Sequence, residues 1–72
     1  MVKILIADTD IQRNSASCQF LANEKGFEIE STNDGSSTIK KYLEIEPNIF
    51  ILDSNFTDIK TLEIIDRLSI SP

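Results

Sequence analysis

Two short apolar runs, each followed at once by an aspartate, constrain the fold of this chain more than any other feature. The first is Val2–Ala7, in which Lys3 is the only polar member, and Asp8 follows it. The second is Ile49–Leu52, which is followed by Asp53. Such a run is typical of a strand that is buried on both faces of a parallel sheet. The two runs therefore predict an α/β protein.

The segments between these runs alternate between helical and extended patterns. Residues 11–25 carry apolar side chains at spacings that fit one broad face of a helix, and Gly26 follows where a C-terminal cap belongs. Residues 27–30 alternate apolar and acidic side chains, which is typical of a half-exposed edge strand. A turn cluster at residues 33–37 is rich in helix-capping side chains, and the helix that it opens must end before Pro47.

A third helix is predicted after the second apolar run. Its apolar positions recur at helical spacing, at Ile59, Leu62, Ile65 and Leu68. Thr57 or Asp58 is available as its N-cap. The order β-α-β-α-β-α implies parallel strands joined by right-handed crossovers. Because the second strand has the pattern of an edge strand and the other two are apolar, the expected spatial order is 2-1-3.

This strand order places three acidic residues at one edge of the sheet. Asp8, Asp10 and Asp53 lie where the winding direction reverses, and open α/β sheets bind ligands at this switch point. Carboxylates at one place repel one another unless a positive charge joins them, and Mg²⁺ typically binds one or two carboxylates plus waters and phosphate oxygens. An aspartate beside such a cation can attack phosphorus. A plainer interpretation stays open, in which Asp8 or Asp10 simply caps the following helix.

Two segments and one turn carry a resemblance to a known family. They are K-I-L-I-A-D at residues 3–8 with a further acid at Asp10, P-N-I-F-I-L-D at residues 47–53, and N-D-G at residues 33–35. Together they resemble the first half of a bacterial response regulator receiver domain. The resemblance covers essentially the whole chain. It implies a flavodoxin-like, receiver-like α/β half domain at residues 1–72, truncated after its third helix.

The resemblance also implies a site at the carboxyl ends of the strands. Asp53 stands at the phosphoacceptor position, and the implied metal ligands are Asp8, Asp10, Asp53 and the backbone carbonyl of Asn55. Receivers usually have a second acid directly after the first, but Thr9 occupies that place, and a neutral hydroxyl is a much weaker Mg²⁺ ligand. The resemblance therefore implies a degenerate acidic pair and a Mg²⁺ ion that is bound weakly or not at all.

Three interpretations of function remain open. The first is a two-component (phosphorelay) signal transduction protein, a truncated receiver that is not an enzyme and acts mainly as a protein-interaction and regulatory module. The second is a fragment of a full-length phosphoaccepting response regulator, whose hydroxyl residue and lysine after the fourth and fifth strands would lie beyond this chain. The third is an unrelated small α/β interaction domain. A histidine kinase or another response regulator is the partner class that the resemblance implies.

An open sheet edge predicts self-association. In the order 2-1-3 the strand Ile49–Leu52 lies at the edge, and an apolar edge strand is a template for another chain. A chain of 72 residues also has a small core, which a partner chain often supplements. We therefore expect a two-fold homodimer through the edge at residues 49–52, with swapping or repacking of the third helix between chains as the alternative.

Composition excludes several classes of function. The net charge of −5 repels phosphate backbones and anionic lipids, so direct binding to nucleic acid or to a membrane is not expected. The chain has no histidine, which removes the commonest general base and metal ligand. Its single cysteine, Cys18, cannot form an intrachain disulfide, is expected to be a buried structural thiol, and favours a reducing, cytoplasmic location.

Overall fold

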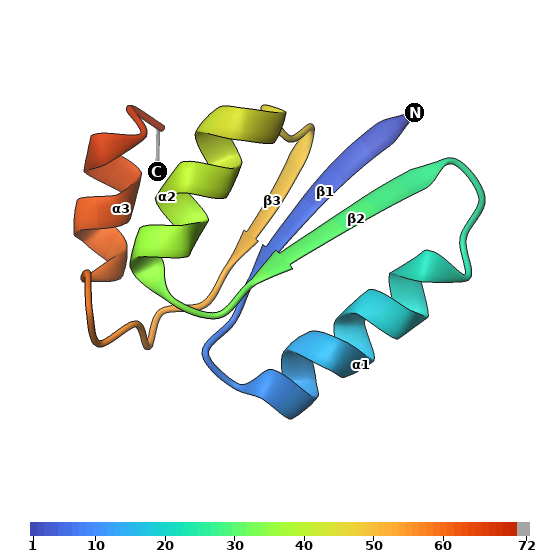
Figure 1. Cartoon of the computed structure of the whole chain (residues 1–72), viewed down its shortest axis with the longest axis horizontal. Helices are drawn as coiled ribbons and strands as arrows, with labels where there is room; N and C mark the ends of the chain where they lie inside the picture. The colour runs from blue at the N-terminus through green and yellow to red at the C-terminus, as the bar shows by residue number, and fades with distance from the viewer. Residues whose placement is uncertain (71–72) are drawn as a thin grey trace.

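The computed structural model describes residues 1–70, which form alternating strands and helices around one parallel sheet (Figure 1). The elements are β1 (Val2–Ala7), α1 (Ile11–Ala22), β2 (Phe27–Thr32), α2 (Gly35–Ile45), β3 (Ile49–Leu52) and α3 (Thr61–Arg67). The strands lie in the order β2-β1-β3 and all pairs are parallel. The predicted α/β class and the strand order 2-1-3 of a flavodoxin-like half domain are confirmed. Within residues 1–70, no helix is long and apolar enough to cross a bilayer.

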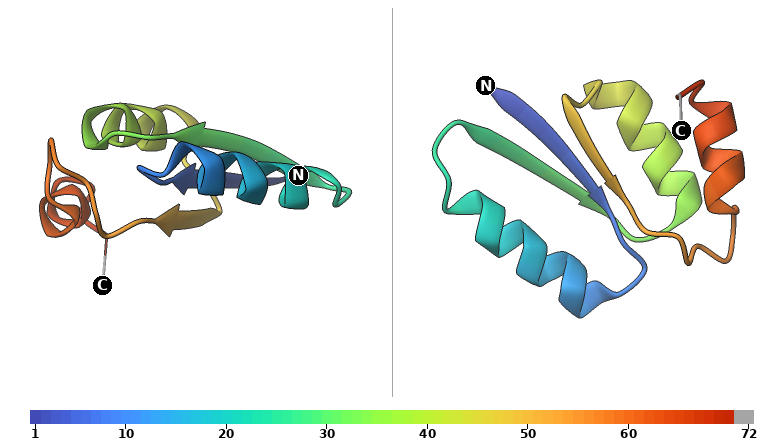
Figure 2. Two further views of the ribbon diagram at one scale, coloured as in Figure 1. Left: turned by 90° about the horizontal axis from the view of Figure 1, so that it is seen from below. Right: turned by 180° about the vertical axis from the view of Figure 1, so that it is seen from behind.

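The sheet separates the helices into two layers. Figure 2 shows α1 on one side of the sheet and α2 with α3 on the other side. The central strand β1 is the most deeply buried element, since residues 4–7 are each at most 2% exposed. The core on the α2 and α3 side is built on Ala7, Phe56 and Ile64. Partly buried apolar residues pack around these three, namely Ile39, Phe50, Leu52, Ile59 and Leu68.

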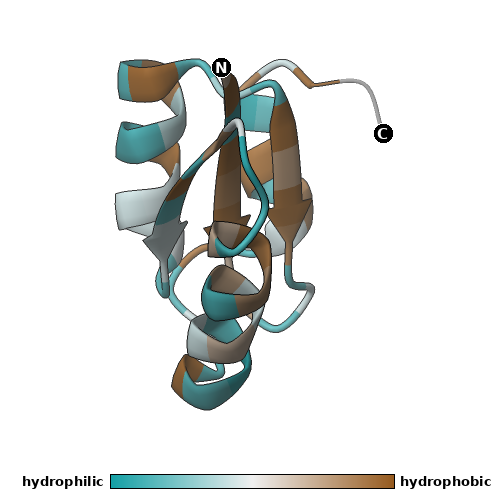
Figure 3. Cartoon of the chain, turned by 90° about the vertical axis from the view of Figure 1, so that its right-hand side faces the viewer, coloured by the Kyte–Doolittle hydropathy of each residue, from teal (hydrophilic) through white to brown (hydrophobic). Residues whose placement is uncertain are grey.

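The strand β3 is less buried than its sequence predicts. Ile49 and Ile51 are each 46% exposed, so the expectation of a strand buried on both faces is wrong. The register pairs them with Ile4 and Ile6 of β1, and alternation then puts all four on the face opposite the core around Ala7. Figure 3 views the sheet from the α1 side, where the apolar ribbon of β3 runs beside α1 without a helix in front of it.

Two helix boundaries differ from the sequence predictions. The first helix ends at Ala22 rather than near residue 25, and Gly26 adopts a left-handed φ of 89° in the turn that enters β2. The third helix begins after Lys60, so neither Thr57 nor Asp58 is its N-cap. The carboxylate of Asp58 instead accepts hydrogen bonds from the backbone of the α2 N-terminus, a partner that lies far away in the sequence.

The apolar face expected for the first helix is also wrong in part. Ile11 and Phe20 are 69% and 72% exposed, and the buried residue of α1 is the polar Asn14. Cys18 is half-buried and its thiol donates to Asn14 Oδ1 at 3.4 Å. Asn14 thus gives α1 a buried polar contact with the ends of β1 and β2, and apolar side chains of the helix line a hollow beside Ile51 of β3.

Candidate functional site

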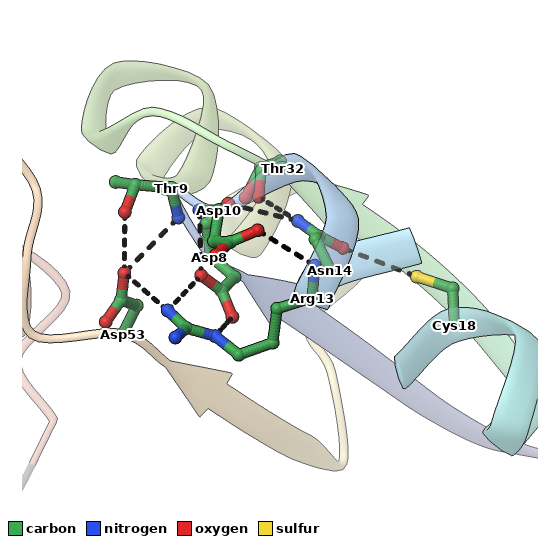
Figure 4. Close-up of polar contacts among 8 residues, drawn as sticks. All are labelled: Asp8, Thr9, Asp10, Arg13, Asn14, Cys18, Thr32 and Asp53. Atoms are coloured by element: carbon green, nitrogen blue, oxygen red, sulfur yellow. Dashed lines mark hydrogen bonds and ion pairs between the residues drawn. The ribbon is translucent and has the colours of Figure 1, made fainter. Parts of the chain in front are cut away.

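The candidate site lies where β1 and β3 end side by side (Figure 4). Asp8 follows β1 and Asp53 follows β3, and the parallel register places both at the carboxyl edge of the sheet. Their side chains are only 13% and 9% exposed. The Asp53 backbone N–H donates to Ala7 O at 2.8 Å, which ties the two strand ends together. The structure thus brings together two of the predicted site residues.

Arg13, on the first turn of α1, joins these two carboxylates. Its guanidinium donates two hydrogen bonds to Asp8, from Nε to Oδ2 at 2.6 Å and from Nη2 to Oδ1 at 2.7 Å. The same Nη2 lies 3.5 Å from Asp53 Oδ2. The hydrogen bond from Arg13 lowers the pKa of Asp8 below its usual range, and the paired carboxylate raises the pKa of Arg13. Both partners therefore stay charged at neutral pH.

Thr9 bonds directly to Asp53. Its hydroxyl donates to Asp53 Oδ2 at 2.7 Å, and its backbone N–H lies 3.3 Å from the same oxygen. Together with Arg13, Thr9 supplies all the polar contacts that the Asp53 carboxylate makes within residues 1–70, and all of them go to Oδ2. The other oxygen, Oδ1, makes no hydrogen bond or ion pair within residues 1–70.

Asp10 has a different role from Asp8 and Asp53. Its carboxylate accepts the backbone N–H of Arg13 at 3.0 Å, which makes Asp10 the N-cap of α1. Its own N–H donates to Asp8 Oδ1 at 3.0 Å. Asp10 is exposed and engaged with the helix, so the plainer capping interpretation describes its contacts in the structure.

The residues present do not fit a magnesium site as they are arranged. Asp8 and Asp53 face each other without a third acidic side chain between them, since no cluster of three or more acidic, cysteine or histidine side chains with a metal-binding arrangement occurs within residues 1–70. Asp10 is committed to the helix cap, and a guanidinium already lies between Asp8 and Asp53. Asn55 lies exposed in the loop after β3. The metal-binding roles of Asp8, Asp10, Asp53 and the Asn55 carbonyl stay predictions.

Asn14 holds the backbone beside the site in place. This residue was not identified from the sequence. Its side-chain N–H₂ donates to Thr32 O at 2.8 Å and to Asp8 O at 3.2 Å. Asn14 is 6% exposed, so these bonds satisfy carbonyls at the ends of β2 and β1 in a largely dry environment. The signal in the sequence is a polar residue among the apolar positions of a predicted amphipathic helix.

Arg13 was also missed, although its position carries a signal. A basic side chain in the first turn of a helix is disfavoured by the positive end of the helix dipole. Asp8 and Asp10 precede Arg13 closely in the sequence and supply the compensating negative charge. An arginine at such a position beside two acids indicates a local ion-pair cluster.

Comparison with known proteins supports the fold and leaves the function open. The chain is similar to the crystal structure of the N-terminal domain of an uncharacterised protein from Wolinella succinogenes, with a TM-score of 0.88 and 25% sequence identity. The match covers 96% of this chain and 55% of that chain, so this chain spans about half of its structural neighbour. No protein-family model and no curated protein gave a match.

Proposed function

We propose that this chain is a receiver-like module of two-component signal transduction that acts through protein interactions, with Asp53 at the phosphoacceptor position. The observation that carries the proposal is the convergence of Asp8 and Asp53 at the ends of neighbouring parallel strands in a 2-1-3 sheet. Two carboxylates at a switch point whose side chains are only 13% and 9% exposed are unusual as mere solubilising residues, because removing a charge from water is unfavourable unless the charge is paired.

Self-association through β3 is the second part of the proposal. The opposite edge strand, β2, carries Glu28 and Glu30, and charged residues of this kind discourage pairing with another chain. The edge strand β3 carries no charge and leaves Ile49 and Ile51 half-exposed. Beside it lies an open hollow of about 350 Å³, lined by Ala16, Ser17, Phe20, Leu21 and Ile51. A second copy that pairs with β3 would cover the apolar side chains among them.

A specific observation favours one second candidate, a working phosphoacceptor. Asp53 Oδ1 makes no polar contact within residues 1–70, so a nucleophilic oxygen remains available. Partners of either candidate would be a histidine kinase or another response regulator, and neither candidate is an enzyme in its own right.

Sedimentation velocity and intact-mass analysis together test the proposal. The full chain is incubated with acetyl phosphate and MgCl₂, alongside an untreated sample and the D53N variant. For an interaction module we expect a reversible dimer at micromolar concentration in all three samples, without a stoichiometric gain of mass. A gain of one phosphoryl group that D53N abolishes would support the phosphoacceptor. A monomer over the whole concentration range would contradict the interaction module.

A further inference from the structure

We propose that the Arg13 guanidinium is the built-in counterion of the Asp8–Asp53 pair and takes the place that a divalent cation would hold there. This inference deepens the proposed function and rests on it, because the proposed function identifies the divalent cation as Mg²⁺. It concerns how the site is regulated, because a site neutralised by its own side chain does not depend on the supply of Mg²⁺.

The geometry of Arg13 is that of a bridging cation. One side-chain nitrogen, Nη2, lies 2.7 Å from Asp8 Oδ1 and 3.5 Å from Asp53 Oδ2, and Nε completes a two-bond contact with Asp8. The planar fork of an arginine matches a carboxylate in this manner better than a lysine would. The contacts draw both strand-end acids toward one positive group, as Figure 4 shows.

The electrostatics require a positive group at this position. Asp8 and Asp53 are both about nine-tenths buried, and two carboxylates that are close together and poorly hydrated destabilise each other. Arg13 meets this requirement permanently, because a guanidinium keeps its charge at every physiological pH. It is also tethered to the site through α1, so it does not pay the translational entropy that a diffusing ion loses on binding.

The residues next to Arg13 supply no further carboxylate for a Mg²⁺ ion. Thr9, between Asp8 and Asp10, brings no negative charge to the site and donates a hydrogen bond to Asp53. The carboxylate of Asp10 caps α1 by accepting the backbone N–H of Arg13. A Mg²⁺ ion demands near-octahedral coordination by oxygen, so it would have to displace the guanidinium before it could reach both carboxylates.

Unfolding of the full chain in MgCl₂, compared with NaCl at equal ionic strength, tests this inference. The variants are R13Q, which removes the charge, and R67Q, which removes an exposed arginine paired with Glu63 at 3.0 Å and serves as the control. We expect Mg²⁺ to add nothing specific to the stability of the wild type or of R67Q. We expect R13Q to be less stable and to gain a Mg²⁺-specific stabilisation, about a 10-fold shift in its unfolding constant when Mg²⁺ is at ten times its Kd.

Two outcomes would overturn the inference. One is a Mg²⁺-specific stabilisation of the wild type as large as that of R13Q, and the other is the absence of any Mg²⁺ response in R13Q. If R13Q does not fold, a Mn²⁺ titration of the wild type followed by NMR decides the question. Selective broadening of the Thr9 and Asp53 amide signals at submillimolar Mn²⁺ would overturn the inference, and unchanged signals would support it. Failure of the proposed function would appear in the sedimentation and mass measurements, and it would leave this comparison unaffected.

Discussion

The hydroxyl of Thr9 donates a hydrogen bond of 2.7 Å to Oδ2 of Asp53, across the ends of the neighbouring strands β1 and β3. The side chain that follows the first strand-end aspartate is thus a donor to the second one. With an acid at this position the same contact would be a repulsion. The two strand ends are therefore held by hydrogen bonds and by Arg13, and their stability can be tested residue by residue.

The Thr9 bond predicts a difference between two small substitutions. Thr9→Val keeps the shape of the side chain but removes the donor to the largely buried Asp53 carboxylate, so we expect it to lower the free energy of unfolding by about 1–2 kcal/mol. Thr9→Ser keeps the hydroxyl and should lose clearly less. Urea unfolding at pH 7 measures both variants. Equal stability of the two variants would contradict a role for the hydroxyl.

The lowered pKa values of Asp8 and Asp58 predict a loss of stability in acid. The Arg13 guanidinium lowers the pKa of Asp8, and the backbone N–H groups of Gly35 and Ser36 lower the pKa of Asp58. Both values lie below the ordinary 3.8, so the folded state binds fewer protons than the unfolded state in this range. The stabilisation is therefore complete well above pH 3.8 and is lost as the pH falls through the folded-state values.

Urea midpoints measured from about pH 7 down to about pH 3 check this dependence, which is expected to be steepest at the acid end. R13Q should lose less stability over this range than the wild type, because its Asp8 pKa is no longer held down by the guanidinium. R67Q should follow the wild-type curve. A wild-type midpoint that stays constant or rises toward low pH would show that these carboxylates are not stabilised in the folded state.

The position of Asp10 predicts that its charge is dispensable and its capping oxygen is not. Asp10→Ala removes the acceptor for the Arg13 backbone N–H, and loss of an N-cap costs about 1 kcal/mol. Asp10→Asn retains a capping oxygen and should be close to the wild type in urea unfolding. A loss in Asp10→Asn as large as in Asp10→Ala would indicate that the carboxylate charge itself is needed at the site.

Strand positions and strand order follow from short-range patterns, and most site contacts do not. The apolar runs that precede Asp8 and Asp53 predict the positions of β1 and β3, because strands of a parallel sheet are rich in apolar residues, although only β1 is buried on both faces. No such pattern predicts that Asp58 caps α2 instead of α3, since this contact forms only when the β3–α3 loop meets the N-terminus of α2 in the folded chain. The half-exposure of Ile49 and Ile51 could not be predicted from a local pattern either, because it depends on which face of the sheet the helices leave uncovered.

The contact between the β2–α2 and β3–α3 loops predicts a strict requirement for glycine at position 35. A Cβ atom on Gly35 would lie 2.9 Å from Asp58 Oδ1 and 2.9 Å from Ile59 Cβ, which is too close for an unstrained contact. We expect Gly35→Ala to lower the free energy of unfolding by about 1–3 kcal/mol through overpacking. Ser36→Ala, at the exposed neighbouring position, keeps the backbone bond to Asp58 and is the control. A Gly35→Ala variant as stable as the control would show that the loops separate easily.

The uncovered face of β3 predicts how self-association can be disrupted without unfolding the chain. Ile51→Lys places a charge on the half-exposed edge strand, in the hollow that Ile51 and Phe20 line, and we expect sedimentation velocity to show a monomer. Leu62→Lys is the matched control, because Leu62 is 78% exposed on α3, which packs on the opposite side of the sheet. Both variants should keep their secondary structure by circular dichroism. Dissociation by Leu62→Lys but not by Ile51→Lys would place the interface on the α3 side and would exclude pairing through β3.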